Sequence, residues 1–201
     1  MKRPAPVPPP PVDARRVIAH TRAWVERAVV GLNLCPFAKA PLVKGQLRFV
    51  VFEGDDPRAL LDALCEEMKA LVQADPGAVE TTLLIHPNVL QDFDAFNDFL
   101  DAADAVLEEL GLDGVLQVAS FHPQYRFADT AADDPGNATN RAPYPTLHLL
   151  REASVERAVA AFPAAEAIYE ANIATLEALG AEGWARLQAQ CRADADADAK
   201  R

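Results

Sequence analysis

Residues 120–127 read S-F-H-P-Q-Y-R-F, and residues 139–152 read T-N-R-A-P-Y-P-T-L-H-L-L-R-E. In both segments, apolar residues that suit a core strand alternate with histidine, arginine and asparagine, which suit a binding site. Solvated loops are usually rich in Gly, Ser, Lys and Glu, whereas proline and the turn-forming residues fix local geometry. The two segments therefore predict strands that end at a functional site.

Three short apolar runs predict strands, at Leu47–Phe52, Thr81–Ile85 and Gly114–Phe121. Helical stripes separate the runs, the first with Asp56 as N-cap and Pro57 at its first position. This alternation is typical of right-handed crossovers in a parallel sheet. We expect an α/β fold: a single domain with a small, mainly parallel sheet of three or four strands covered by helices. The fourth strand, Thr146–Leu150, is expected to be antiparallel and at an edge.

The remaining segments set the limits of the expected domain. An apolar stripe predicts a helix that starts after Asp13 and ends near Gly31, which we expect in the left-handed conformation. Two or three helices follow the last strand and cover the sheet. Residues 13–190 then form the domain. Residues 1–12 are a proline-rich disordered tail, and residues 191–201, which alternate Ala with Asp, are a second disordered tail or a frayed helix end.

Composition limits the classes of partner. The chain has 201 residues, and its 19 Lys plus Arg against 30 Asp plus Glu give a net charge of -11. A field of this sign repels polyanions, so we expect neither nucleic acid nor an anionic membrane surface as a partner. No apolar run approaches the roughly 20 residues of a membrane span. Three cysteines in dissimilar contexts argue against a disulfide framework and predict a cytoplasmic location.

Two histidines follow successive predicted strands. His86 stands in I-H-P-N and His122 in F-H-P-Q. The carboxyl ends of parallel strands share one edge of a sheet, where sites in such folds lie. Neighbouring strands are about 4.8 Å apart, so the imidazoles are expected close enough to share a ligand as acid and base. The alternative is that each ring hydrogen-bonds a loop carbonyl. His148, inside the last strand, faces either the core or the site.

Cys35 is the third candidate for a catalytic role. It lies in a non-helical C-P-F segment, where a thiol is exposed and its thiolate can be stabilised by an imidazolium. A Cys–His pair supports covalent catalysis. Position 38 is Ala, so a C-x-x-C redox motif is absent. A metal site from Cys35, His86 and His122 is conceivable by ligand type, although the spacing matches no metal signature. The alternative is a packed turn residue.

Arginines in the same segments indicate the substrate class. Arg126 and Arg141 stand among aromatic residues, as anion clamps or as structural ion pairs with nearby aspartates. The remaining candidate substrate-binding residues are Asn140, Tyr144 and His148. The sequence lacks the G-x-G-x-x-G, G-x-x-x-x-G-K-[ST] and G-x-S-x-G motifs of common dinucleotide, NTP and serine-hydrolase sites. The identity of any cofactor therefore stays unknown.

These segments also carry a family resemblance. Together with G-L-N-L-C-P-F-A at Gly31–Ala38, the two segments quoted first resemble a bacterial family of uncharacterised proteins, domain of unknown function 1415. The resemblance spans about Val17 to Leu179. It departs at Ala142, where Ser is expected in most relatives. It implies a cytoplasmic bacterial protein and supplies no activity, cofactor or catalytic residue.

Three functional hypotheses follow from the residues. The first is an enzyme that acts on a small anionic substrate, with Cys35, His86 and His122 as catalytic groups at the carboxyl edge of the sheet. The second is a binding or assembly module that docks partners through loop 121–147, which predicts an exposed apolar patch around its aromatic residues. The third is a metal-binding protein. The sequence sets no oligomeric state.

Overall fold

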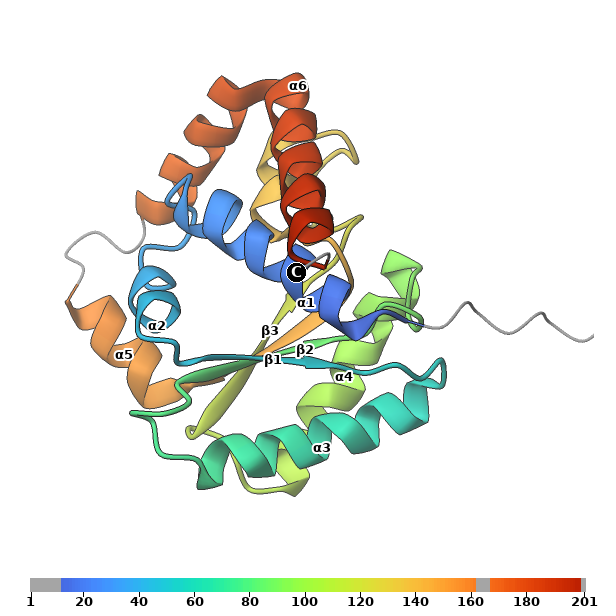
Figure 1. The fold of residues 1–201 in the computed structure, drawn as a ribbon. Coiled ribbons are helices and arrows are strands. Elements are labelled where there is room, and N and C mark those ends of the chain that lie inside the picture. The colour runs from blue at the N-terminus through green and yellow to red at the C-terminus, as the bar shows by residue number, and fades with distance from the viewer. Residues whose placement is uncertain (1–11, 162–166, 200–201) are drawn as a thin grey trace, which may run out of the picture.

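The structure is a computed structural model that describes residues 12–161 and 167–199 (Figure 1). Its elements are, in order, α1 (Ala14–Trp24), the π-helix η1 (Val25–Val30), α2 (Lys39–Val43), β1 (Leu47–Val51), α3 (Pro57–Gln73), β2 (Thr81–Ile85), α4 (Phe93–Glu109), β3 (Leu116–Phe121), the 3-10 helix η2 (Pro135–Asn140), β4 (Thr146–Arg151), α5 (Glu152–Ala160) and α6 (Ala167–Asp198). The α/β class and the strand positions are as predicted. That residues 13–190 form one domain stays a prediction.

The sheet is mixed rather than mainly parallel, which corrects the sequence prediction. The strand order is β1-β2-β4-β3, and only β1 and β2 pair in parallel. Strand β4 pairs antiparallel with β2 on one side and with β3 on the other. The predicted crossovers give β1, β2 and β3 one direction, so their carboxyl ends do share an edge. The insertion of β4 replaces the expected β2–β3 pair.

Burial explains why β4 lies inside the sheet and not at an edge. Leu147 and Leu149 are 0% exposed, and their backbone groups pair on both sides. An edge strand leaves half of its backbone donors and acceptors unpaired. The apolar sequence T-L-H-L-L-R is better satisfied between two strands, where both its faces and both its edges are covered.

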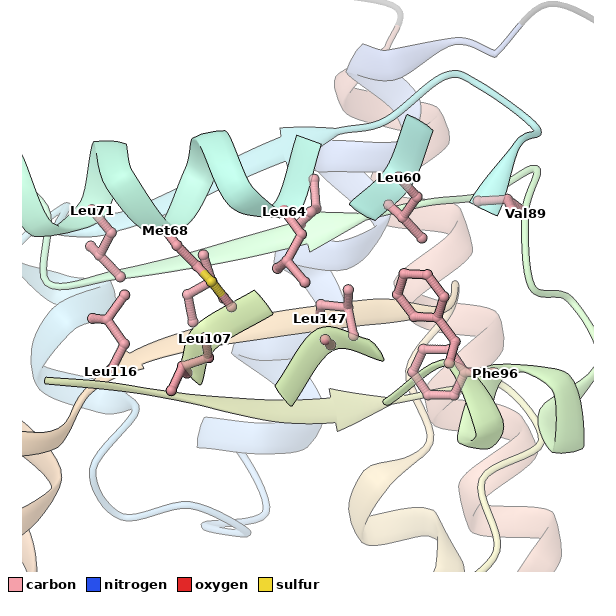
Figure 2. Packing of buried hydrophobic residues seen from close by; sticks show 13 residues of the cluster. Leu60, Leu64, Met68, Leu71, Val89, Phe96, Leu107, Leu116 and Leu147 are labelled. Carbon is pink, nitrogen blue, oxygen red and sulfur yellow. The ribbon is translucent and has the colours of Figure 1, made fainter. Parts of the chain in front are cut away.

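Helices α3 and α4 cover one face of the sheet and form a closed apolar core (Figure 1). Asp56 caps α3 by accepting from the Arg58 N–H, as predicted, and Pro57 is its first residue. Figure 2 shows leucines of α3 pointing at Leu116 of β3 and Leu147 of β4, with Phe96 of α4 at one end of the cluster. This layer is densely packed, since most of its members are less than 2% exposed.

Helices α1, η1, α2, α5 and α6 lie on the opposite side of the sheet (Figure 1). Trp24 and Val25 are buried there against Leu83 and Ile85 of β2. The helix-ending residue differs from the prediction, because Gly31 has φ -65° while Asn33 is left-handed at φ 56°. An Asn amide makes that conformation tolerable.

Helix α6 is longer than the sequence predicts. A kink at Gly180, with φ 65°, turns its second half back against α1. Cys191 is 1% exposed, and Arg16 pairs with Asp196 at 2.8 Å. Residues 191–198 are therefore a packed helix and not the predicted disordered tail, because the aspartates of the Ala/Asp repeat meet arginines of α1 and η1. The predicted tail of residues 1–12 lies outside the described residues except for Val12.

Candidate functional site

The two predicted catalytic histidines meet in the core and not in a cleft. His86 and His122 follow β2 and β3, and both are 0% exposed. Both rings pack on Phe96 of α4, with ring centroids 5.7 Å from His86 and 5.1 Å from His122. Both rings therefore contact one phenylalanine in the closed core, and neither is open to a ligand from solvent.

Loop carbonyls hold both imidazoles. His86 Nδ1 donates to the Val89 carbonyl at 3.0 Å, and His122 Nε2 donates to the Leu90 carbonyl at 3.2 Å. The Gln124 backbone N–H donates to His122 Nδ1 at 3.0 Å. Burial lowers the pKa of His86 to about 4 and also lowers the pKa of His122. Both rings are neutral near pH 7, in the arrangement that the sequence analysis gave as the alternative.

The two predicted anion clamps lie on a loop beyond this core. Arg141 Nε donates to the Tyr125 carbonyl at 3.1 Å, and its Nη2 donates to the Ala132 carbonyl at 2.6 Å. Arg126 pairs with Asp94 at 3.4 Å. Both arginines line a shallow cavity of about 430 Å³, but Asp92 and Asp94 line it too. Carboxylates beside the guanidinium groups disfavour an anion there, and Arg141 acts as a clamp on its own loop.

A larger cleft lies on the opposite face of the sheet. Its volume is about 940 Å³, and strands of the sheet, η1, α2 and α5 supply its walls. Apolar side chains of Trp24, Val29 and Phe121 line one part of it. Pockets for small organic molecules in proteins have this size and this apolar character. The structure places three of the predicted site residues in this cleft: Cys35, Asn140 and His148.

His148 has a defined tautomer. Thr81 Oγ1 donates its only proton to the Leu149 carbonyl at 2.6 Å, so it accepts from His148 Nε2, also at 2.6 Å. The other nitrogen, Nδ1, therefore carries a lone pair, and it has no hydrogen-bond partner among the described residues. Burial lowers the pKa of His148 to about 4, which keeps the ring neutral. His148 therefore brings a neutral imidazole with a lone pair on Nδ1 to the lining of this cleft.

Cys35 is half-buried beside the end of η1. Its backbone N–H donates to the Val29 carbonyl at 3.3 Å, which fixes the turn. Burial raises the pKa of the Cys35 thiol, and hydrogen bonds from the backbone of Phe37 and Ala38 offset this only in part. The cysteine is therefore a neutral thiol near pH 7 and not the activated thiolate of the sequence hypothesis.

Tyr144 lines neither the cleft nor the cavity that holds Arg126 and Arg141. Its hydroxyl lies 3.3 Å from Nδ1 of His20 on α1, and the two rings meet edge to face at 5.4 Å. Tyr125 and Phe127 contact each other at 5.1 Å in the loop after β3. All three aromatic residues are half-buried. Phe127 also contacts the exposed ring of Tyr169 at 6.3 Å, and docking through loop 121–147 stays a prediction.

The three residues proposed as metal ligands do not lie together. Among residues 12–161 and 167–199, no three His, Cys, Asp or Glu side chains lie where they could hold one ion. Cys35 lines the cleft, while His86 and His122 pack on Phe96 on the other side of the sheet. The sheet lies between Cys35 on one side and the two histidines on the other, so it separates the proposed ligands.

Comparison with known families agrees with the motifs. A family model described as "Protein of unknown function (DUF1415)" matches residues 16–186. The chain belongs to this family. No curated protein and no solved structure matches it.

The family match covers the cleft, the histidine pair and the loop that Arg141 holds through the Tyr125 and Ala132 carbonyls. It ends within α6. No helix in the described part of the chain has the length and apolar character needed to cross a membrane.

Sequence reasoning missed the residues that build the cleft. Thr81 fixes the His148 tautomer, yet it reads as an ordinary strand residue. Trp24 lies within the helix predicted after Asp13 and Phe121 ends a predicted strand, and neither was named as a site residue, although both line the cleft. One signal was available: in T-L-H-L-L-R, Leu147 and Leu149 alternate with His148, so a histidine on the opposite face from two core leucines is expected.

Proposed function

We propose that this protein binds a small organic molecule in the cleft formed by the sheet, η1, α2 and α5. The observation that carries the proposal is the combination of cleft volume, about 940 Å³, with an apolar wall and a neutral imidazole acceptor at His148. A few convergent polar groups in an apolar pocket are typical of ligand sites. The proposal keeps the small ligand of the sequence hypothesis and moves its site to the other face of the sheet.

An unpartnered donor in the cleft wall supports the same proposal. Trp24 is 4% exposed, and its indole Nε1 is buried without a hydrogen-bond partner among the described residues. Buried N–H groups in proteins are nearly always paired. The donor is closed off from the cleft in this structure, so a bound molecule reaches it only when the indole ring shifts.

The electrostatics favour binding over acid–base or covalent catalysis. An efficient general base has a pKa near the working pH, whereas the pKa of His148 is about 4. Cys35 remains a thiol because burial raises its pKa. We further infer a reducing compartment such as the cytoplasm, because Cys35, Cys65 and Cys191 are all free.

A neutral fluorescent probe, N-phenyl-1-naphthylamine, tests the proposal. Its fluorescence is expected to rise on binding to the wild-type protein. Ala158→Phe, which fills the cleft from α5, is expected to abolish that rise. Ala160→Phe is the matched control, because Ala160 is exposed on the same helix and does not line the cleft. Equal probe affinity in both variants, with unchanged melting temperatures, contradicts the proposal.

A further inference from the structure

The two ends of the cleft differ in charge. β4 runs through its floor, from Thr146, which pairs with Phe121, to Arg151, which pairs with Leu116. Five residue steps of an extended strand span about 17 Å. Phe121 and Trp24 lie toward the first end. All four residues with a formal charge that line the cleft lie toward the second end, where β1 and β2 begin and β4 ends: Lys44, Glu80, Arg151 and Arg157.

Positive charge prevails at that second end. Two cations, Lys44 and Arg157, stand against one carboxylate, Glu80, which lies 3.8 Å from Arg157. Lys44 is exposed and makes no ion pair with any residue that the structure describes. Arg151 Nη2 donates to the carbonyls of Leu71, Ala74 and Val79, at 2.6, 2.9 and 3.2 Å. Leu71 and Ala74 lie at the C-terminal end of α3, on the opposite face of the sheet from the cleft, so the Arg151 guanidinium points away from the cleft and adds no charge to it.

This local charge is opposite to that of the whole chain. The net charge is -11, yet the cleft end carries a net charge of about +1, from Lys44 and Arg157 against Glu80, when His148 and Cys35 are neutral. A cleft with low-dielectric walls focuses the field of such a cluster. Lys44 and Arg157 at one end of an apolar cleft are complementary to one anionic group on an otherwise apolar molecule.

We infer that the ligand is an amphipathic anion. Its acidic head lies between Lys44 and Arg157, and its apolar body extends along the sheet past His148 toward Phe121 and Trp24. This inference rests on the proposed function and deepens it, since it gives the chemical class of the molecule that the cleft binds. A carboxylate on an alkyl or aryl body has the required chemistry.

Competition with the neutral probe separates the two proposals. Octanoate and octan-1-ol share the same chain length, and only octanoate has a charged head at pH 7. The ratio of their affinities, measured by displacement of N-phenyl-1-naphthylamine, isolates the contribution of the head group. Lys44→Gln with Arg157→Gln is expected to lower the preference for octanoate by about tenfold, or 1.4 kcal/mol. The octan-1-ol affinity is expected to stay unchanged.

The matched control removes the same two charges from the other face. Arg58 and Lys69 are exposed on α3, so Arg58→Gln with Lys69→Gln gives the same net charge without touching the cleft. Its octanoate preference is expected to remain as in the wild type. Glu80→Gln is expected to tighten octanoate by about threefold, because it removes the one opposing carboxylate.

The outcomes distinguish failure of the inference from failure of the proposed function. If the probe binds in the cleft but octanoate and octan-1-ol respond equally to both double variants, the ligand class is wrong while the cleft remains a binding site. If Glu80→Gln weakens octanoate, the head group lies elsewhere. If Ala158→Phe leaves the affinity of the probe unchanged, the proposed function itself is wrong.

Discussion

The two faces of the sheet carry similar side chains and differ in what covers them. On one face, α3 and α4 seal His86 and His122 against Phe96, and both rings are 0% exposed. On the other face, η1, α2 and α5 leave a cleft of about 940 Å³ over His148. The imidazoles have similarly lowered pKa values, about 4 for His86 and for His148. The helical cover, and not the residue type, decides which histidine lines an open cleft.

Replacement of Phe96 tests the contrast most strongly. Phe96→Ala is expected to lower the free energy of unfolding by about 4 kcal/mol, because the ring is 0% exposed and supports both histidines. Phe121→Ala, on the cleft face, is expected to cost roughly half as much, since Phe121 is only half-buried. Urea denaturation measures both. Equal losses would mean that the cleft face is packed as tightly as the core face.

Acid is expected to destabilise the core face through His86. Its folded pKa, about 4, lies below the ordinary 6.5, so the unfolded chain binds the extra proton between those values. Stability is therefore full above pH 6.5 and falls as pH drops toward 4, by on the order of 3 kcal/mol for this buried ring. Urea midpoints from pH 7 to pH 4 measure the fall.

His86→Asn sharpens that measurement. The Asn amide can replace Nδ1 as donor to the Val89 carbonyl but does not titrate. The variant is expected to start less stable at pH 7 and to lose less stability on acidification than the wild type. A pH dependence identical to that of the wild type would show that His86 is not the group that takes up the proton. Arg126→Ala is a control with the histidines intact and keeps the full dependence.

Substitutions in the loop that Arg141 holds are expected to change the free energy of unfolding less than Phe96→Ala does. Arg141→Ala leaves the Tyr125 and Ala132 carbonyls without their donor, at a cost of about 2 kcal/mol. Arg126→Ala removes a pair whose side chains are 47% and 80% exposed, so its cost is below about 0.5 kcal/mol. Thermal denaturation of the two variants checks the difference. The reverse ranking would give Arg126 the structural role.

Local pattern predicted much of the fold. The limits of β2 and the caps at Asp13 and Asp56 follow from neighbouring residues alone, and all are confirmed. The place of β4 was wrong, because strand pairing is a contact between segments more than 60 residues apart, such as Leu83 with His148. The packed end of α6 was missed for the same reason, since Asp196 finds Arg16 across the fold.

The sequence predicted several residues of the candidate site but not how they are arranged in space. Cys35, Asn140 and His148 were singled out, and the structure brings them to one cleft. His86 and His122 share an edge as expected, but their burial against Phe96 of α4 depends on how the helix packs on the sheet. The face on which a side chain lies depends on strand register and helix cover, and residue type carries neither.

Cys35 gives the smallest effect and decides between binding and covalent chemistry. Because burial raises its pKa, iodoacetamide is expected to modify Cys35 at pH 7 more slowly than it modifies free cysteine, with the rate rising as pH increases. Peptide mass spectrometry separates it from the half-buried Cys65 and the buried Cys191. Cys35→Ser is expected to change the free energy of unfolding by less than about 1 kcal/mol and to leave probe binding intact. Faster modification than free cysteine would mean a stabilised thiolate, and the cleft would then be the site of a nucleophile and not only of a bound ligand.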